Sequence, residues 1–375
     1  MRLPEQEFTL DSFIEYLDSH VNQVFGKEDR KWLKVYLVYS SDNWRELLRP
    51  FGLSQLGHIY HIKIPPRYET KEEHGNAVSY YVHELTQGLL MFFSSSRERD
   101  YEITLKRLID STRGLTEMWV TPDSFEKVKN HLISKHEARI YRFIARRNLF
   151  TKIPARFRPD VERRLSYSGE DATEVLKETR EAYGITPTSI DFRLGHDTLK
   201  ITNDGLFLLR AVNRSMLRVV LETIDLILAE QIRIRKTSGQ LTRSKFRISL
   251  KDWQIDVPTV NAGTIILPKV MLTGHMIDRL LSYKEEWEEM LQEEKASKEF
   301  SFIDVGVQQG SGIFSATAVD EKKGTVFGIN GGENVVVLVP KYRTTYESFI
   351  RFFRLVSELI DDEAFLTTFG EMNAR

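Results

Sequence analysis

The sequence predicts an α+β protein of at least two domains. Its 375 residues suit two hydrophobic cores better than one. Segments with the spacing of amphipathic helices alternate with segments that have the spacing of strands. The second half of the chain repeats the order helix, strands, helix. Hydrophobic residues make up 41% and charged residues 29%, which is typical of an ordered globular chain.

The first 150 residues predict an α/β-type open-sheet domain, because helices and strands alternate there. Phe13, Ile14 and Leu17 share one face of the first expected helix. Thr121-Pro122-Asp123 begins a later one, since proline fits the first turn and an acid is stabilised at the positive end of the helix. We expect helices at 8–25, 101–113 and 122–135. Strands are expected at 32–39, 58–64, 116–120 and 138–144, and at 78–85 and 89–96 on either side of a turn at 86–88.

Residues 151–169 are predicted to be a basic linker, because two prolines interrupt them and they have little periodicity. Residues 170–375 then form a C-terminal α+β domain. It holds either two repeats, 170–236 and 264–361, each with a helix, three or four strands and another helix, or two unrelated α+β pieces. Asn330-Gly331-Gly332 indicates a hairpin between two of these strands. This order of elements over 170–361 resembles the repeats of the TATA-box-binding-protein-like fold, which implies an antiparallel sheet with helices on one face.

The composition of the chain excludes several classes of functional site. The chain has no cysteine, which excludes disulfides, thiolate metal sites and a cysteine nucleophile. The N-terminus has no apolar segment of the signal-peptide type, and charged residues interrupt the longest apolar stretch, 216–232. We therefore expect a cytoplasmic protein with no membrane partner. No sequence motif predicts a cofactor, a metal or a catalytic residue.

Two clusters of basic residues carry the functional prediction. The first lies between 135 and 164 and is interleaved with the aromatic residues Tyr141, Phe143, Phe150 and Phe157. The second lies between 233 and 251, where no acidic residue interrupts it. Arginine forks bind phosphates and aromatic rings stack on unpaired bases. The predicted nucleic-acid-binding residues are Arg139, Arg142, Arg146, Arg147, Lys152, Arg156, Arg158, Arg163, Arg164, Arg233, Arg235, Lys236, Arg243, Lys245 and Arg247.

A weaker indication comes from the strands around Arg193 and Lys200. Apolar residues alternate there with polar ones, which predicts a sheet with one covered face and one open face. An open face that carries Arg193 and Lys200 would suit the backbone of a nucleic acid.

The sequence therefore predicts a nucleic-acid-binding accessory protein, a non-catalytic subunit of a DNA or RNA processing or defence assembly. Two alternatives stay open at this point. One is a self-associating protein–protein scaffold, in which the basic regions and the acidic segment 285–299 meet partners of opposite charge. The other is a phosphodiesterase or nuclease with a non-standard site built on His61, or on Asp160 and Glu162.

Overall fold

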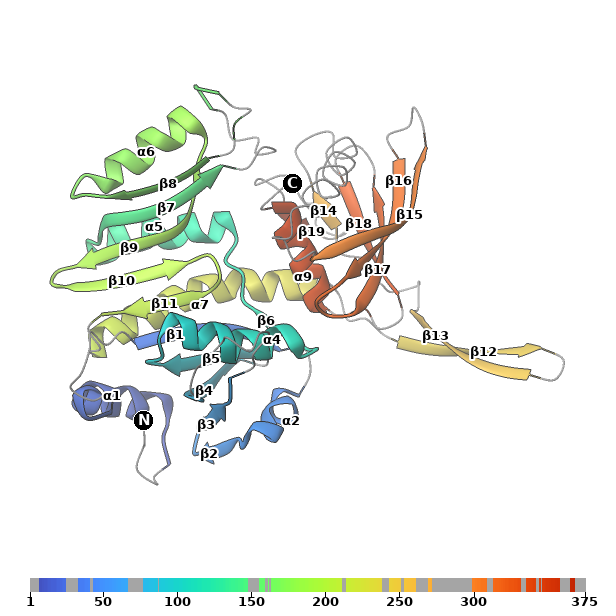
Figure 1. Cartoon of the computed structure of the whole chain (residues 1–375), viewed down its shortest axis with the longest axis horizontal. Helices are drawn as coiled ribbons and strands as arrows, with labels where there is room; N and C mark the ends of the chain where they lie inside the picture. Colours follow the sequence, from blue (N-terminus) through green and yellow to red (C-terminus); the bar gives the residue numbers. More distant parts are fainter. Residues whose placement is uncertain are drawn as a thin grey trace. The chain divides into compact units, whose positions relative to one another are not determined.

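The fold is α+β, with helices and antiparallel sheets, as predicted. It is a computed structural model (Figure 1). The structure describes residues 7–24, 33–40, 43–66, 77–86, 88–147, 155–158, 161, 163–210, 214–237, 243–250, 253–260, 269–271, 299–308, 313–331, 335–341, 344, 346–357 and 365–367.

The chain forms two compact units, divided at different places from those the sequence predicted. The first unit is Met1–Arg147 with Pro154–Leu228, and the second is Asn148–Ile153 with Ala229–Arg375. Residues 163–209 supply strands to the same sheet as the N-terminal residues. Part of the expected linker 151–169, Arg163–Ser168, is strand β8 of this sheet.

One 11-stranded sheet organises the first unit. Its strands run in the order β2-β3-β4-β5-β1-β11-β10-β9-β7-β8, with β6 paired to β1. The strands are β1 (Leu33–Ser40), β2 (Ser54–Leu56), β3 (Ile59–Ile64), β4 (Val78–Thr86), β5 (Leu89–Ser94), β6 (Leu115–Glu117), β7 (Arg139–Arg147), β8 (Arg163–Ser168), β9 (Thr186–Leu194), β10 (Asp197–Thr202) and β11 (Leu206–Leu209).

Helices lie on both faces of this sheet, but unevenly (Figure 1). The larger core joins one face to residues of α1 (Leu10–Val24), α5 (Pro122–His136), α6 (Ala172–Tyr183) and α7 (Arg214–Thr237). The smaller core covers the other face only near β1 to β5, with α2 (Trp44–Leu48), the π-helical turn η2 (Glu102–Lys106) and α4 (Arg107–Ser111). The single turns η1 (Arg49–Phe51) and α3 (Glu98–Tyr101) flank them.

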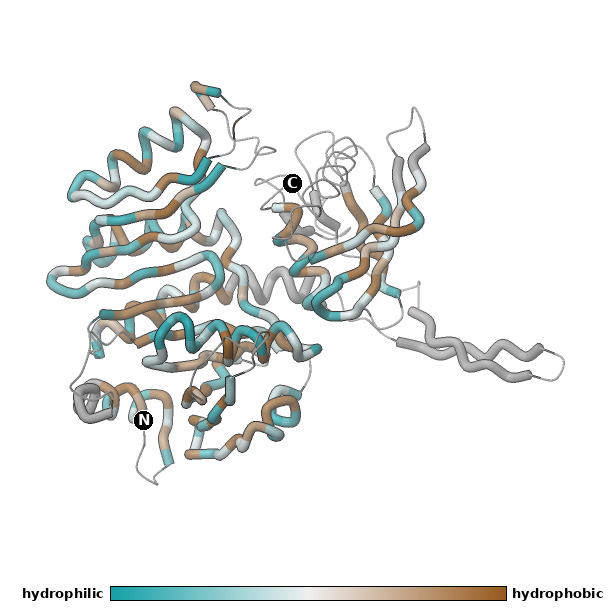
Figure 2. The backbone as a smooth tube through the Cα atoms, in the orientation of Figure 1, coloured by the Kyte–Doolittle hydropathy of each residue, from teal (hydrophilic) through white to brown (hydrophobic). Residues whose placement is uncertain are grey.

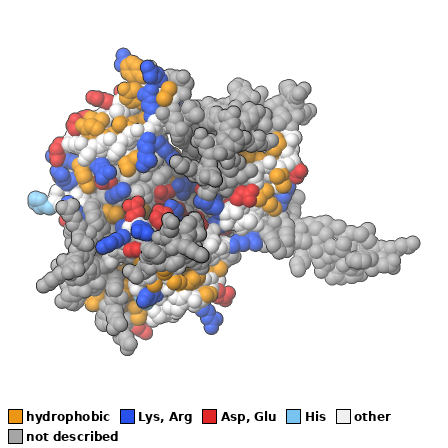
Figure 3. Space-filling model, in the orientation of Figure 1, with side chains coloured by type: hydrophobic (Ala, Val, Ile, Leu, Met, Phe, Trp, Pro, Cys, Tyr) orange, Lys and Arg blue, Asp and Glu red, His pale blue; other side chains and the backbone are white. Residues whose placement is uncertain are grey.

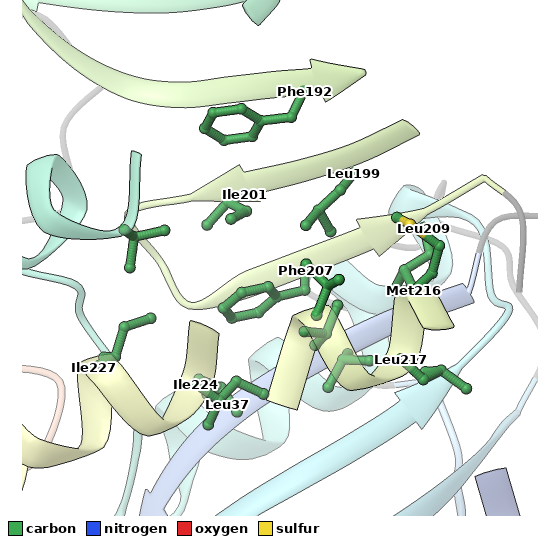
Figure 4. Close-up of a cluster of buried hydrophobic side chains, with 14 of the residues drawn as sticks. Leu37, Phe192, Leu199, Ile201, Phe207, Leu209, Met216, Leu217, Ile224 and Ile227 are labelled. Atoms are coloured by element: carbon green, nitrogen blue, oxygen red, sulfur yellow. The ribbon is translucent and has the colours of Figure 1, made fainter. Parts of the chain in front are cut away.

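Strand alternation produces the larger core. Phe192, Leu199 and Phe207 lie on the same face of β9, β10 and β11, and each is at most 1% exposed. They pack against Met216 and Ile224 of α7 (Figure 4). The intervening residues of these strands are mostly polar, and Figure 2 shows the alternation along the backbone. Residues of opposite character are thus separated to the two faces of the sheet.

Single capping and turn residues determine where several helices and strands begin or end. The Oγ1 of Thr121 accepts a hydrogen bond from the backbone N–H of Ser124 and caps α5. Gly184 ends α6 in the left-handed conformation, at a φ of 59°. Gly205 turns the chain between β10 and β11 at a φ of 72°, and its carbonyl oxygen accepts from the N–H of Leu37 in β1. The turn after β10 thereby ties β11 to the N-terminal strands.

The second unit holds a six-stranded sheet and a separate hairpin. Phe300, Phe327, Phe349 and Phe352 form an edge-to-face aromatic cluster between the sheet and α9. The elements are β12 (Arg243–Leu250) paired with β13 (Trp253–Val260), and β14 (Lys269–Met271), β15 (Phe300–Gln308), β16 (Ile313–Asp320), β17 (Thr325–Gly331), β18 (Val335–Pro340), α9 (Tyr346–Leu355) and β19 (Phe365–Thr367).

The predicted duplication stays a prediction. The order α6, β9–β11, α7 is present, and so is the order β15–β18, α9. Strands β9–β11, however, continue the sheet of the N-terminal residues, whereas β15–β18 belong to another sheet. The helix expected at 276–295 lies outside the described residues. Among the described helices, none has the length and apolar character needed to cross a bilayer.

Candidate nucleic-acid interface

One half of the large sheet has a face that no helix of the described chain covers. This half consists of β7–β11, and the uncovered side is opposite α5, α6 and α7. The register of the strands places six cationic side chains on this side. We call them the basic sheet face: Arg139, Arg142, Arg146, Arg164, Arg193 and Lys200. Figure 3 shows Lys and Arg side chains, with a few carboxylates, on the surface seen from the same direction as Figure 1.

A row of opposed residues crosses this face at right angles to the strands. Arg142 of β7 is opposite Asp191 of β9, which is opposite Lys200 of β10. Lys200 is opposite Leu208 of β11, which in turn is opposite Lys34 of β1. Strands lie about 4.8 Å apart, so the row places a cation roughly every 10 Å with one carboxylate between the first two.

The carboxylate in this row is buried. Asp191 is 8% exposed. Burial raises the pKa of the Asp191 carboxyl above its ordinary value, although the positive charges of Lys200 and Arg142 act in the opposite direction. Lys34 is 7% exposed, and burial lowers the pKa of its ammonium. The centre of the row is therefore a desolvated place where charges interact strongly.

Buried hydroxyl groups next to the row lack hydrogen-bond partners. Ser189 of β9 and Thr202 of β10 are directly opposite each other, one step along the sheet from Asp191 and Lys200. The Oγ of Ser189 and the Oγ1 of Thr202 are both buried without a partner among the described residues. An unsatisfied buried polar group costs about 1–3 kcal/mol, so these two hydroxyls lower the stability of this part of the sheet.

Several cations of the face have no carboxylate bound to them. In the described part of the chain, Arg142, Arg164 and Lys200 form no salt bridge within 4.0 Å. Arg193 differs, because its Nη1 lies 2.6 Å from Oε1 of Glu170 and its guanidinium lies over the Tyr141 ring. The first three side chains therefore keep their donors for water or for an anion.

Two residues of the first basic cluster, one of them the predicted Arg147, have buried side chains in the fold. Arg147 is 3% exposed and donates from Nη1 to the carbonyl oxygens of Tyr183 and Gly184, so it binds the end of α6. Phe143 is fully buried. Both lie on the helix-covered side of β7, because alternate residues of a strand face opposite sides. Arg163, opposite Arg147, stacks on the Tyr183 ring with its guanidinium carbon 4.4 Å from the ring centre.

The remaining residues of the first cluster lie elsewhere. Arg156 and Arg158 are exposed next to Phe157, whose backbone N–H donates to the carbonyl oxygen of Ala182 near the end of α6. Lys152 and Phe150 lie outside the described residues.

The second cluster is divided between two elements. Arg233, Arg235 and Lys236 are in the last turns of α7, and Arg243, Lys245 and Arg247 take alternate positions of β12. The side chains of these six lie outside the described part, so their role in binding stays a prediction.

Sequence reasoning missed Lys34 and Asp191 as members of the site. The alternation of β9 and β10 was visible in the sequence, but nothing in the sequence shows that Lys34 joins their row through β11.

The nuclease alternative receives no support from the described residues. Asp160 and Glu162 lie outside them. His61 packs against the Tyr81 ring, and burial lowers the pKa of its imidazole.

The comparisons with known proteins give a family model and one relative. Residues 124–204, from α5 through β10, match the model of the AF_0896_M family middle domain. An uncharacterized protein of Archaeoglobus fulgidus is 21% identical over 373 residues, which cover 95% of this chain and 95% of that protein. No solved structure matches the chain. The chain is thus similar along nearly its whole length to an archaeal protein, and the strands β7–β10 of the basic sheet face lie within the matched family segment.

Proposed function

We propose that this protein binds nucleic acid through the basic sheet face, as a non-catalytic accessory subunit of a DNA or RNA processing or defence assembly. The observation that carries the proposal is the face of β7–β11 that no described helix covers, on which Arg142, Arg164 and Lys200 have no salt bridge among the described residues. Phosphate contacts need cations of this kind, held in a fixed array.

Two features favour a polymer over a single small anion. The row from Arg142 through Lys200 to Lys34 extends over five strands, or about 20 Å at 4.8 Å per strand. Arg146 and Arg164, directly opposite each other, add two cations near the outer edge of the sheet. A nucleic-acid backbone carries several phosphates over such a distance.

A salt titration with matched variants tests the proposal. Fluorescence anisotropy measures the affinity for labelled single-stranded DNA, single-stranded RNA and duplex DNA between 50 and 200 mM salt, conditions where counterion release dominates. The variant Arg142→Ala/Arg164→Ala/Lys200→Ala should weaken binding and make the salt slope shallower by about 2 for a single strand, at ~0.7 per lost phosphate contact.

The control variant removes the same charge from the helix-covered side. Lys177 of α6 and Arg214 and Arg218 of α7 are exposed, so Lys177→Ala/Arg214→Ala/Arg218→Ala has the same net charge as the first variant. It should retain the wild-type affinity and slope. Equal losses in both triple variants would mean that binding follows net charge alone, and the proposed interface would be wrong.

A further inference from the structure

A second cluster of functional groups lies on the opposite side of the first unit, between two helices. His131 and His136 are on α5, and Glu222 is on α7. All three side chains are partly exposed. The cluster is separated from the basic sheet face by the sheet, and the inference drawn from it does not depend on nucleic-acid binding.

The three ligand atoms are already close together. The Nε2 of His136 lies 3.2 Å from Oε2 of Glu222, and the Nε2 of His131 lies 4.0 Å from the same oxygen. All the potential ligand atoms lie within 4.8 Å of one another. Around a tetrahedral zinc ion with bonds of about 2.0–2.1 Å, neighbouring ligand atoms lie roughly 3.3 Å apart. A small rotation of the His131 ring would complete that geometry.

His131 has an unused ligand atom. Its Nε2 is buried and has no hydrogen-bond partner, which is costly for a polar atom out of water.

We propose that His131, His136 and Glu222 bind a divalent transition-metal ion of the zinc type. Two imidazoles with one carboxylate favour zinc and its neighbours over magnesium or calcium, which prefer oxygen ligands. Three protein ligands leave a fourth position for water, as in sites that polarise a bound molecule. Glu222 joins α7 to α5 through this ion.

Lys135 occupies the place of the cation in this structure. Its Nζ lies 2.7 Å from Oε2 of Glu222, and its side chain is 55% exposed. When the metal binds, the ammonium turns outward into water, because two cations on one carboxylate oxygen repel each other. Lys135 is therefore a competitor of the metal, and its removal should strengthen metal binding.

Zinc titration of the metal-free full-length chain tests the proposal. Isothermal calorimetry, with competition by a zinc chelator, should give one tight site in the wild type. Loss of an outer-shell partner weakens metal affinity by ~10–100-fold, and His131→Ala/His136→Ala removes two ligands, so it should weaken zinc binding by at least about 100-fold. His58→Ala/His196→Ala, which removes two exposed histidines of the same unit, should leave the affinity unchanged.

Lys135→Ala separates metal binding from a purely structural role of the His131–His136–Glu222 cluster, because only metal binding predicts a change in zinc affinity. It should bind zinc several-fold more tightly than the wild type, and zinc should raise its melting temperature, because a ligand bound only to the native state stabilises it. Equal zinc affinity in the wild type and His131→Ala/His136→Ala, or weaker binding in Lys135→Ala, would overturn the proposal. Because Lys135 is exposed, this variant folds even where a histidine variant does not.

Discussion

The Nη1 of Arg147 donates a hydrogen bond to the backbone carbonyl oxygen of Gly184, 3.2 Å away, at the end of α6. A second bond from the same atom reaches the carbonyl oxygen of Tyr183. The guanidinium thus satisfies carbonyl groups that a helix leaves without partners at its C-terminal end. This arginine is a structural residue, although it lies in the middle of a basic cluster.

Replacement of Arg147 should therefore lower stability without changing nucleic-acid affinity. Arg147→Met retains most of the apolar stem but loses both bonds, and we expect a loss of about 1.5–3 kcal/mol in the free energy of unfolding. Urea denaturation measures it. Arg142→Met, in the same strand but exposed, should change stability by less than ~0.5 kcal/mol. The assignment fails if the two variants have equal stability.

Asp191→Asn should alter the pH dependence of stability. Burial raises the pKa of this carboxyl in the folded state, so the folded protein holds a proton at pH values where the unfolded chain has lost it. The stability of the wild type therefore falls as pH rises above about 4, through the folded-state pKa. The asparagine variant lacks this contribution, and its advantage should grow with pH and then level off. Urea midpoints from pH 3.5 to 7 measure this, and parallel profiles would contradict it.

The same substitution should strengthen nucleic-acid binding, since it removes the one carboxylate in the row between Arg142 and Lys200. A unit charge about 4 Å from another contributes about 1 kcal/mol even when bulk water screens the pair, so we expect a gain in affinity of at least roughly fivefold. Anisotropy at constant salt measures it. An affinity equal to that of the wild type would place the phosphates away from this row.

Tyr80 should contribute to loss of stability in alkali. Burial raises the pKa of its phenol to about 12, and its hydroxyl is hydrogen-bonded to that of Thr104 at 2.8 Å. Unfolded tyrosine loses its proton near pH 10, so this residue destabilises the fold progressively as pH rises from about 10 to 12, by ~1.4 kcal/mol per unit. Tyr80→Phe should flatten that fall. Urea midpoints at pH 9, 10 and 11 report the slope, and an unchanged slope would contradict the prediction.

Gly205 and Gly195 form a matched pair of turn glycines. Both have a positive φ, of 72° and 61°, where a side chain costs about 1–2 kcal/mol. A Cβ at Gly205 would lie 2.5 Å from the carbonyl oxygen of Met118, whereas one at Gly195 meets nothing within 4 Å. Gly205→Ala should therefore lower the melting temperature clearly more than Gly195→Ala. Equal shifts in calorimetry would show that only the backbone conformation matters.

Local signals were sufficient to predict most elements. Thr121-Pro122 predicted the start of α5. Strands β17 and β18 pair as the hairpin expected around Asn330, although Asn330 and Gly331 belong to β17 and not to the turn. Strand β8 was not predicted, because Arg163–Ser168 has few apolar residues and one open face. A strand with so little buried surface resembles a polar loop in sequence.

The two candidate sites depend on strand pairing and helix packing, which the order of residues along the chain does not show. In the sequence, Arg142 and Arg147 belong to the same basic cluster between 135 and 164. In the fold they lie on opposite sides of β7, because alternate residues of a strand face opposite ways. His131 and His136 are five residues apart, which is not a same-face spacing on a regular helix. Their partner Glu222 is on another helix, and only the packing of α5 against α7 brings the three together.

The pairing of β1 with β11 has a consequence for biosynthesis. Strand β1 ends at Ser40 and β11 begins at Leu206, so the ribosome needs roughly 10–30 s between them at ~5–20 residues per second. During that interval the Leu33–Tyr36 part of one edge of β1 has no native neighbour, because β6 pairs only with Val38–Ser40, and this part is open to pairing with other nascent chains. A nascent chain that stops before β11 carries this exposed edge permanently, and its solubility should recover only when the chain extends beyond Leu209.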